Sequence, residues 1–343
     1  MNAKTKVGRA GAAAVAVTAS ALTLAACGTS GSSGTGGGGS PKIAAVIKGL
    51  DNPFFQTMKQ GIDAQGKTAG VSTTVQAANS ITDTTGQADR LTALAGQDFS
   101  CFIVNPISGT NLVQGLARIA AAKKTIVNID SPIDAAAAKA ASATPATYIG
   151  TDNVQAGTMA GQEMLKLVPS GSVGVIGGVA GDVTSSARVD GFKQGVGNKL
   201  TVLQTVAADW DRQTALTAAT NVLRANPSLG GFFVANDDMG LGVVRAVANA
   251  GKTGKVKVIS VDGIKDALTA IQAGQLDATV AQYPYTIGQM GVQACVAAAK
   301  SKTLPTNVKA PVELVTKADA AKALAATPKP FGAYADPFTA LTK

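Results

Sequence analysis

From Lys42 onward, short apolar runs alternate with longer amphipathic stretches, and this alternation restricts the fold more than any other feature of the chain. It is typical of βαβ units, in which helices join parallel strands and cover the sheet that they form. In the first half of the chain, the expected strands are 43–48, 72–77, 101–104 and 125–129. The expected helices between them are 54–69, 83–96 and 109–122.

The pattern restarts after an alanine-rich stretch, 134–146, which we expect to be loose. The strands of the second half are predicted at 147–150, 172–176, 201–206, 231–234, 256–260 and 278–281. Its helices are predicted at 153–167, 184–197, 212–225, 237–250, 264–272 and 285–300. A chain of 343 residues usually divides into two domains. The sequence therefore predicts an α/β protein with two doubly wound parallel-sheet lobes.

Polar and aromatic side chains follow nearly every predicted strand. Since open α/β sheets bind ligands at the carboxyl ends of their strands, two such lobes should share a ligand cleft. The candidates from the first lobe are Lys48, Asn52, Phe54, Phe55, Asp130 and Ser131. The candidates from the second lobe are Arg188, Trp210, Asn236, Asp262 and Gln282.

Several of these residues belong to short motifs that occur in a fixed order. The motifs include Asp51-Asn52-Pro53-Phe54-Phe55, Asn128-Ile129-Asp130, Ala187-Arg188-Val189-Asp190-Gly191, Ala208-Asp209-Trp210-Asp211, Ala235-Asn236-Asp237-Asp238 and Val261-Asp262-Gly263. In order and spacing, over about residues 42–316, they resemble the ribose-binding type of periplasmic sugar-binding protein. The resemblance implies a solute receptor of an ABC importer, with two lobes of the type I periplasmic binding protein fold joined by three crossovers. It also implies a monomer that binds one sugar.

The resemblance carries the ligand role to nine positions and leaves two open. The implied sugar ligands are Asn52, Phe54, Phe55, Asp130, Arg188, Trp210, Asn236, Asp262 and Gln282. Lys48 stands where the ribose-type pattern has a small hydroxyl residue, and Ser131 stands where it has arginine. These two departures leave the identity of the ligand open among a monosaccharide, a polyol and a furanosyl signal molecule.

The resemblance also implies the extents of the lobes. The first lobe is expected to comprise 42–149 and 283–310, and the second 150–282. Residues 311–343 are expected to form a strand and a surface tail, which after about 316 departs from the family as a loose strap. Cys101 begins a strand of the first lobe and Cys295 lies in the helix that returns to it, so a disulfide and two buried thiols are both open.

The candidate side chains suit a sugar because a sugar ring has apolar C–H faces and a rim of hydroxyl groups. Phe54, Phe55 and Trp210 can cover the faces, while carboxylates, amides and a guanidinium can hydrogen-bond to the rim. Each residue also has a structural interpretation. The two phenylalanines could be core residues, and Lys48 and Arg188 could be solvated. Asp130, Asn236 and Asp262 could cap helices or form turns.

The first 41 residues have the pattern of an exported lipoprotein. Residues 1–26 combine three early cations with an apolar core of about 15 residues, too short to span a membrane, and thus predict a signal peptide. Leu24-Ala25-Ala26-Cys27 resembles a lipobox, which implies diacylation of Cys27. The segment 27–41 is predicted to be a flexible Gly/Ser tether. We therefore expect a protein on the outer side of the cell membrane, held by its lipid alone.

Composition excludes several other functions. The chain has no histidine, which removes histidine-dependent nucleophile systems and histidine metal ligands, and its three cysteines are too dispersed for a zinc site. The formal net charge is +9, but the lysines and arginines are scattered, so we expect no nucleic-acid partner. No enzyme activity, cofactor or metal is expected. The alternative functions that remain are a receptor for a sugar-like signal, a LacI-type effector domain and a glycosidase. The protein partners that we expect for the importer are a permease and its ATPase.

Overall fold

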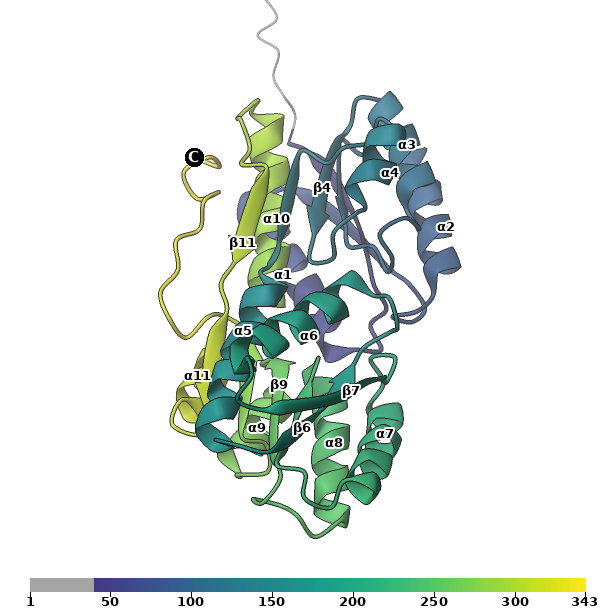
Figure 1. The fold of residues 1–343 in the computed structure, drawn as a ribbon. Helices are drawn as coiled ribbons and strands as arrows, with labels where there is room; N and C mark the ends of the chain where they lie inside the picture. Colours follow the sequence, from purple (N-terminus) through teal and green to yellow (C-terminus); the bar gives the residue numbers. More distant parts are fainter. Residues whose placement is uncertain (1–39) are drawn as a thin grey trace, which may run out of the picture. The chain divides into compact units, whose positions relative to one another are not determined.

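The computed structural model describes residues 40–343, which form two parallel-sheet α/β lobes (Figure 1). The signal peptide, Cys27 and nearly all of the predicted tether lie outside the described residues. The first sheet contains β1 (Lys42–Ile47), β2 (Ser72–Ala77), β3 (Cys101–Val104), β4 (Thr125–Ile129), β5 (Thr147–Thr151) and β11 (Asn307–Ala310). The second contains β6 (Ser172–Gly177), β7 (Thr201–Ala207), β8 (Gly231–Val234), β9 (Lys257–Asp262), β10 (Ala278–Ala281) and β12 (Glu313–Thr316).

The two sheets have the same strand order. The first runs β11-β5-β4-β3-β1-β2 and the second β12-β10-β9-β8-β6-β7, and within residues 40–343 the only antiparallel pair of these sheets is β10 with β12. This order is that of a doubly wound sheet, whose ligand crevice lies at the carboxyl ends of the strands. The predicted fold class is confirmed.

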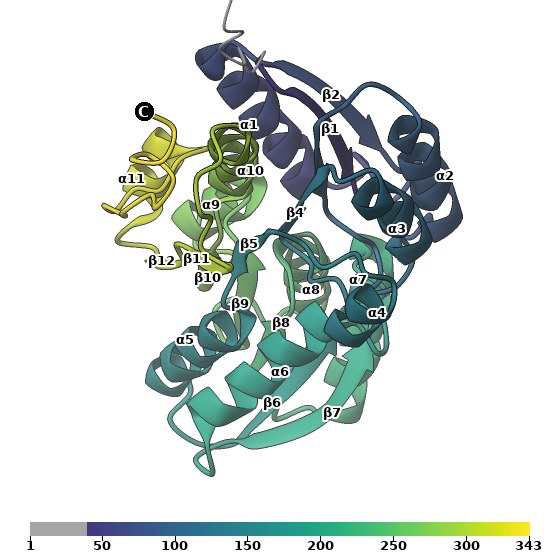
Figure 2. The same ribbon diagram turned by 90° about the horizontal axis from the view of Figure 1, so that it is seen from above.

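Helices cover both faces of each sheet (Figure 2). In the first lobe they are α1 (Pro53–Ala69), α2 (Thr84–Ala95), α3 (Val113–Ala121), α4 (Ala135–Ala140) and α10 (Pro284–Ala299). In the second they are α5 (Asn153–Leu167), α6 (Val183–Val196), α7 (Arg212–Ala225), α8 (Asp237–Asn249), α9 (Lys265–Gln272) and α11 (Ala320–Ala326). Strand β1 shows why both faces are needed, because Ile43, Ala45 and Ile47 enter one core cluster while Ala44 and Val46 enter the other. Alternate residues of a strand point to opposite faces, so a sheet buried on both sides is apolar throughout.

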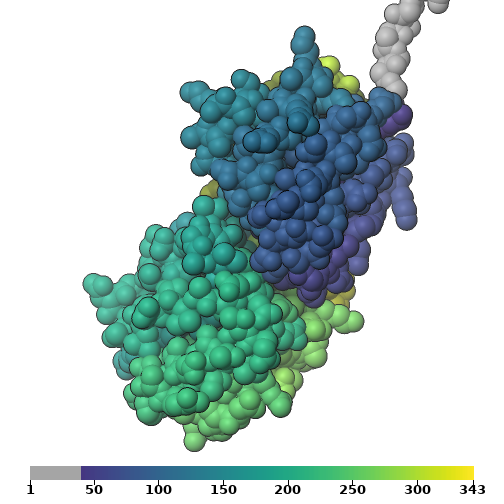
Figure 3. Space-filling view, turned by 90° about the vertical axis from the view of Figure 1, so that its right-hand side faces the viewer, coloured from purple at the N-terminus to yellow at the C-terminus, as the bar shows by residue number. Residues whose placement is uncertain are grey.

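The chain crosses between the lobes after β5, after β10 and between β11 and β12. Residues of the first lobe, coloured purple to blue, and those of the second lobe, in green, adjoin in the space-filling view (Figure 3). A disulfide between Cys101 of β3 and Cys295 of α10, with Cα atoms 5.8 Å apart, fastens this helix to the first sheet. No helix in the part of the chain that the structure covers is long and apolar enough to cross a membrane.

Two expectations for irregular segments were wrong. The alanine-rich stretch contains the short helix α4, because alanine favours helix and the Asp134 carboxylate accepts a hydrogen bond from Ala137 N at 2.7 Å as its N-cap. The C-terminal tail is not a loose strap. It leaves α11 on the second lobe and returns to the first (Figure 1). Phe338 is fully buried there, in the core cluster that includes residues of α10.

Candidate functional site

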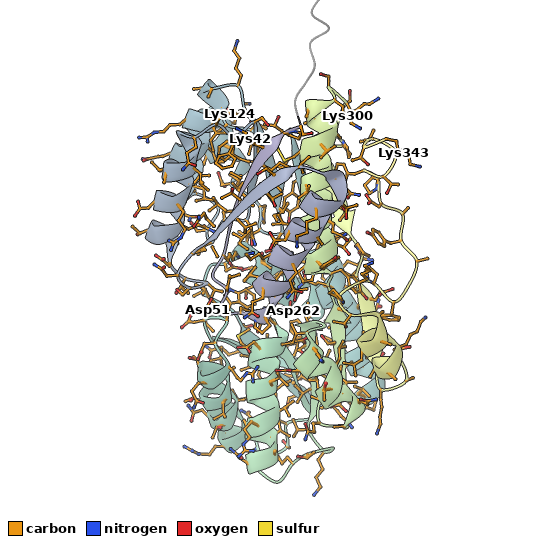
Figure 4. The ribbon with its side chains drawn as sticks, turned by 180° about the vertical axis from the view of Figure 1, so that it is seen from behind. Lys42, Asp51, Lys124, Asp262, Lys300 and Lys343 are labelled. Carbon is orange, nitrogen blue, oxygen red and sulfur yellow. A yellow bond between two sulfur atoms is a disulfide. The ribbon has the colours of Figure 1, made fainter. Side chains whose placement is uncertain are left out.

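A cavity of about 320 Å³ lies between the facing ends of the two lobes. Asp51 and Asp262 mark these facing ends in Figure 4, whereas Lys42 and Lys300 lie at the far end of the first lobe. The cavity brings together ten of the predicted side chains: Lys48, Asn52, Phe54, Phe55, Asp130, Ser131, Arg188, Trp210, Asn236 and Asp262. Gln282 is not on the cavity wall.

Phe54 and Phe55 form the aromatic wall of the first lobe. They occupy the first turn of α1, which begins at Pro53 after Asn52, and their rings meet edge to face with centroids 5.2 Å apart. Both side chains are also buried against the core of the first lobe. The two phenylalanines are therefore both core residues and cavity residues, since each packs against the core of the first lobe and also borders the cavity.

Trp210 supplies the aromatic side chain of the second lobe. Its backbone lies in the left-handed region, with φ of 60°, which is rare for a bulky residue and is typical of functional sites. The indole lies against the backbone of Gly178, where an added Cβ would come within 2.2 Å of the ring. A glycine is thus needed at 178 for this ring to reach the cavity.

Arg188 is held by three groups of the second lobe and is 4% exposed. Its Nε donates to Asn153 Oδ1 at 2.8 Å, and its Nη1 donates to Ala235 O at 2.7 Å and approaches Asp262 Oδ1 at 3.4 Å. Its guanidinium also lies 5.8 Å from the centre of the Trp210 ring. Arginine carries five N–H donors, and the described residues provide no hydrogen bond to those of Nη2, which remain for a ligand.

In the described part of the chain, only one carboxyl oxygen of Asp262 is bound by other side chains. Oδ1 faces Arg188 and accepts a hydrogen bond from Gln282 Nε2 at 2.5 Å, while no residue in 40–343 donates to Oδ2. Gln282, predicted as a ligand, therefore lies behind Asp262 and holds it. Burial raises the pKa of Asp262 to about 8, and the positive charge of Arg188 opposes this rise. With φ at 142°, Asp262 also has a strained backbone.

Asp130 and Lys48 are the charged side chains that the first lobe contributes. Asp130 has φ of 60°, its carbonyl oxygen accepts from Tyr148 Oη at 2.6 Å, and its Oδ2 accepts from Ser131 Oγ at 3.4 Å. Lys48 Nζ lies 5.6 Å from the centre of the Phe55 ring and has no hydrogen-bond acceptor among the described residues. Burial lowers the pKa of Lys48 and raises that of Asp130. Lys48 is buried, so the structure does not support a solvated strand-end lysine.

Asn52 and Asn236 have two tasks each. Their Oδ1 atoms accept hydrogen bonds at 2.9 Å from the backbone N–H of Phe54 and Met239, as the N-caps of α1 and α8. Both residues nevertheless border the cavity, where their amide groups can donate. The capping interpretation is thus correct for Asn236, whereas the N-caps of α4 and α9 are Asp134 and Ile264 and not Asp130 and Asp262. Capping also explains how a loop residue acquires a fixed orientation.

Sequence reasoning missed Asp182. This carboxylate caps α6 by accepting from Ser185 N at 2.8 Å, borders the cavity and acts electrostatically on Lys48 across the cleft. Its place directly after the glycine-rich turn that ends β6 was the available signal. Within residues 40–343, the cavity included, no group of three or more histidine, cysteine or carboxylate side chains could hold a metal ion.

The periplasmic binding protein domain matches residues 43–303. This chain belongs to that family. The D-allose-binding periplasmic protein of Escherichia coli is 40% identical over 275 residues, which cover 78% of this chain and 88% of that protein. A ribose import binding protein of Bacillus subtilis is 30% identical over 276 residues, which cover 80% of this chain and 87% of the relative.

Solved structures of periplasmic binding proteins agree with the sequence relationship. An ABC transporter solute-binding protein from Actinobacillus succinogenes, solved with bound D-allose, has a TM-score of 0.78 at 26% identity and covers 82% of this chain and 99% of its own. A second from Agrobacterium vitis, solved with bound D-fucose, has a TM-score of 0.75 at 29% identity, with coverage of 81% and 96%. The periplasmic binding protein fold of the described residues thus has close counterparts.

Proposed function

We propose that this periplasmic binding protein is the sugar receptor of an ABC importer, which binds one monosaccharide between its lobes and delivers it to the permease. The observation that supports this most is a set of polar atoms without partners among the described residues, carried by buried charged side chains that line the cavity. Lys48 Nζ, Arg188 Nη2 and Asp262 Oδ2 have no hydrogen-bond partner within residues 40–343. Buried charged groups rarely lack hydrogen-bond partners, because each unpaired group lowers the stability of the folded protein.

The arrangement suits an uncharged sugar. Both donors and acceptors line the cavity: Lys48 feels the opposite charges of Asp130 and Asp182, and Arg188 acts on the carboxyl group of Asp262. Charge-assisted hydrogen bonds to hydroxyl groups are about twice as strong as neutral ones. The aromatic side chains Phe54, Phe55 and Trp210 can pack on the C–H faces of the ring.

We propose D-allose as the first sugar to test and D-ribose as the second. A relative at 40% identity is a D-allose-binding protein, relatives at 30% are ribose import binding proteins, and a solved structure at 26% identity has D-allose bound. Lys48 and Ser131 are proposed to set the preference between hexose and pentose, because these two positions depart from the ribose-type pattern.

We further propose that Cys27 carries the lipid anchor. The support is the predicted signal peptide followed by Leu24-Ala25-Ala26-Cys27. Two acyl chains are enough for stable membrane attachment. In cells labelled with radioactive palmitate, the mature protein should carry the label and Cys27→Ser should abolish it. A labelled Cys27→Ser protein would rule out this anchor.

The sugar proposal is tested by the thermal unfolding of residues 40–343, which contain both sheets and their cores, with pentoses, hexoses and polyols. A sugar present at 100 times its Kd adds about 2.7 kcal/mol to the free energy of unfolding and so raises Tm. D-allose should give the largest shift. If no sugar or polyol changes Tm or the emission of Trp210, the proposal is wrong.

The same screen on variants tests how the ligand is chosen. Lys48→Ser and Ser131→Arg restore the residue types of the ribose pattern and should move the preference from D-allose toward D-ribose. Asp98→Asn, at an exposed residue at the far end of the first lobe, serves as the control and should change nothing. An unchanged ranking in both variants would contradict the assignment of specificity to these positions.

A further inference from the structure

Helices α5 and α6 touch through their backbones. An added Cβ at Gly157 would come within 2.0 Å of Arg188 O, and one at Gly191 within 2.1 Å of Val154 O. Such close approach is open only to residues without side chains. As a result, Asn153, the first residue of α5, lies directly beside Arg188 of α6.

Two hydrogen bonds fix the amide of Asn153. Its Oδ1 accepts from Arg188 Nε at 2.8 Å, and its Nδ2 donates to Thr151 O, at the end of β5, at 3.3 Å. An arginine Nε can only donate, so the amide oxygen must face it. Asn153 thereby ties the guanidinium to the segment where the chain crosses from the first lobe to the second.

The guanidinium is planar, so fixing two of its nitrogens fixes the third. Asn153 holds Nε and Ala235 O holds Nη1, which leaves Nη2 as the nitrogen without a partner in residues 40–343, on a side chain that lines the cavity. Without Asn153, the buried Nε–H would have no partner among the described residues, and an unsatisfied buried donor is unfavourable. The side chain would then turn to satisfy it and would move Nη2.

We propose that Asn153 is a positioning residue, which sets the orientation of the Arg188 guanidinium for its ligand without touching the ligand. Asn153 is not on the cavity wall, whereas Arg188 is. The inference deepens the proposed function and rests on it for the ligand role of Arg188. The helix cap of α5 is provided by Asp152, which accepts from Gln155 N at 3.0 Å, so Asn153 is not needed for capping.

The first experiment needs no sugar. Trp210 is the only tryptophan of the chain, and its ring lies 5.8 Å from the guanidinium, so its emission reports where Arg188 is. Residues 40–343 carrying Asn153→Ala or Asn153→Ser, neither of which offers an acceptor at the same reach, should show shifted Trp210 emission. Asn153→Asp keeps the acceptor oxygen and should restore the wild-type emission. Unchanged emission in Asn153→Ala and Asn153→Ser would overturn the proposal.

Thr158→Val is the matched control. Thr158 Oγ1 also lies on α5 and contacts Gly191 O of α6 at 3.3 Å, yet it does not touch Arg188. This variant removes a contact between the same two helices and should leave the Trp210 emission unchanged. If it shifts the emission as Asn153→Ala does, loosened helix packing explains both and the positioning role fails.

The second experiment is a double-mutant cycle with Arg188→Met, using D-allose and D-ribose as probes. Asn153→Ala should weaken binding about 10-fold in the wild-type background, as expected for a lost hydrogen bond to a charged group, and by less than 2-fold in the Arg188→Met background. Equal losses in both backgrounds would overturn the inference. If Arg188→Met itself leaves affinity unchanged, the proposed ligand site fails, and the emission of Trp210 then decides the positioning role alone.

Discussion

At the scale of the residue, the candidate site consists of side chains that serve the protein with one atom and leave another free. Arg188 keeps Nη2, Asp262 keeps Oδ2, and Asp182 caps α6 with Oδ1 alone. Three non-glycine residues of the cavity, Asp130, Trp210 and Asp262, have positive φ angles. Such backbone costs free energy and persists where the surrounding structure enforces it, so rigidity at these positions favours a preformed site.

The pKa of Asp262 makes stability depend on pH. Its folded pKa of about 8 lies above the ordinary value of 3.8, so the folded protein keeps a proton that the unfolded chain has lost between these values. The contribution of this group to stability is therefore complete below about pH 4 and is lost as the pH rises toward 8. The slope for one proton is at most about 1.4 kcal/mol per pH unit.

The variant Asp262→Asn isolates this effect, because asparagine does not titrate. Urea unfolding at pH 5 and at pH 8 should show the wild type losing stability relative to Asp262→Asn as the pH rises. A constant difference between the two proteins across this range would mean that Asp262 is ionised in the folded state already at pH 5.

At the scale of the element, the helix pairs that frame the cleft are held close by glycine. Helices α1 and α10 repeat the arrangement of α5 and α6, since a Cβ at Gly61 would come within 2.0 Å of Tyr285 O and one at Gly288 within 2.4 Å of Met58 O. Both pairs begin at the cleft and carry site residues in or beside their first turns. The spacing of a helix pair thus sets the position of cavity side chains.

Gly157→Ala tests this connection. The added methyl group would meet the backbone of Arg188, which lacks the freedom of a flexible side chain to move away, so α5 and α6 must separate. We expect a loss of about 1–3 kcal/mol in the free energy of unfolding, as for other overpacked sites, together with weaker sugar binding. Both are measured by urea unfolding and calorimetric titration.

Gly96→Ala is the control for the same substitution. Gly96 has φ of −80° at the end of α2 and no atom within 4 Å of an added Cβ. It should be neutral or slightly stabilising. If Gly157→Ala kept the wild-type stability and sugar affinity, α5 and α6 could separate without loss, and the predicted link between their spacing and the site would be wrong.

At the scale of the whole molecule, the C-terminal tail adds a connection between the lobes. Ala320 and Ala323 of α11 pack in a core of the second lobe, and Phe338 lies fully buried in a core of the first. Gln293 Nε2 donates to Asp336 Oδ2 at 2.8 Å, which fastens the returning tail to α10. The chain therefore links its lobes at the tail as well as at the three crossings between the sheets.

Phe338→Ala should destabilise the first lobe by about 3–5 kcal/mol, the usual cost of removing a fully buried phenylalanine. The neighbouring Thr339→Ala changes an exposed residue and should cost less than about 0.5 kcal/mol. Thermal and urea unfolding of both variants measure the difference. Equal stability of Phe338→Ala and the wild type would show that the tail contributes nothing to the core.

The sequence by itself determined the fold class, because the period of its apolar residues states which segments are strands and which are helices. Ten of the eleven candidate side chains predicted from the sequence line one cavity, because residues that follow parallel strands meet at one edge of the sheet. The sequence pattern could not predict side-chain positions that depend on contacts between distant segments. The tertiary structure alone placed Gln282 behind Asp262, brought Asp182 to the cavity and set Asn153 against Arg188. It also buried Phe338, because nothing local in a proline-containing tail states which core its phenylalanine will enter.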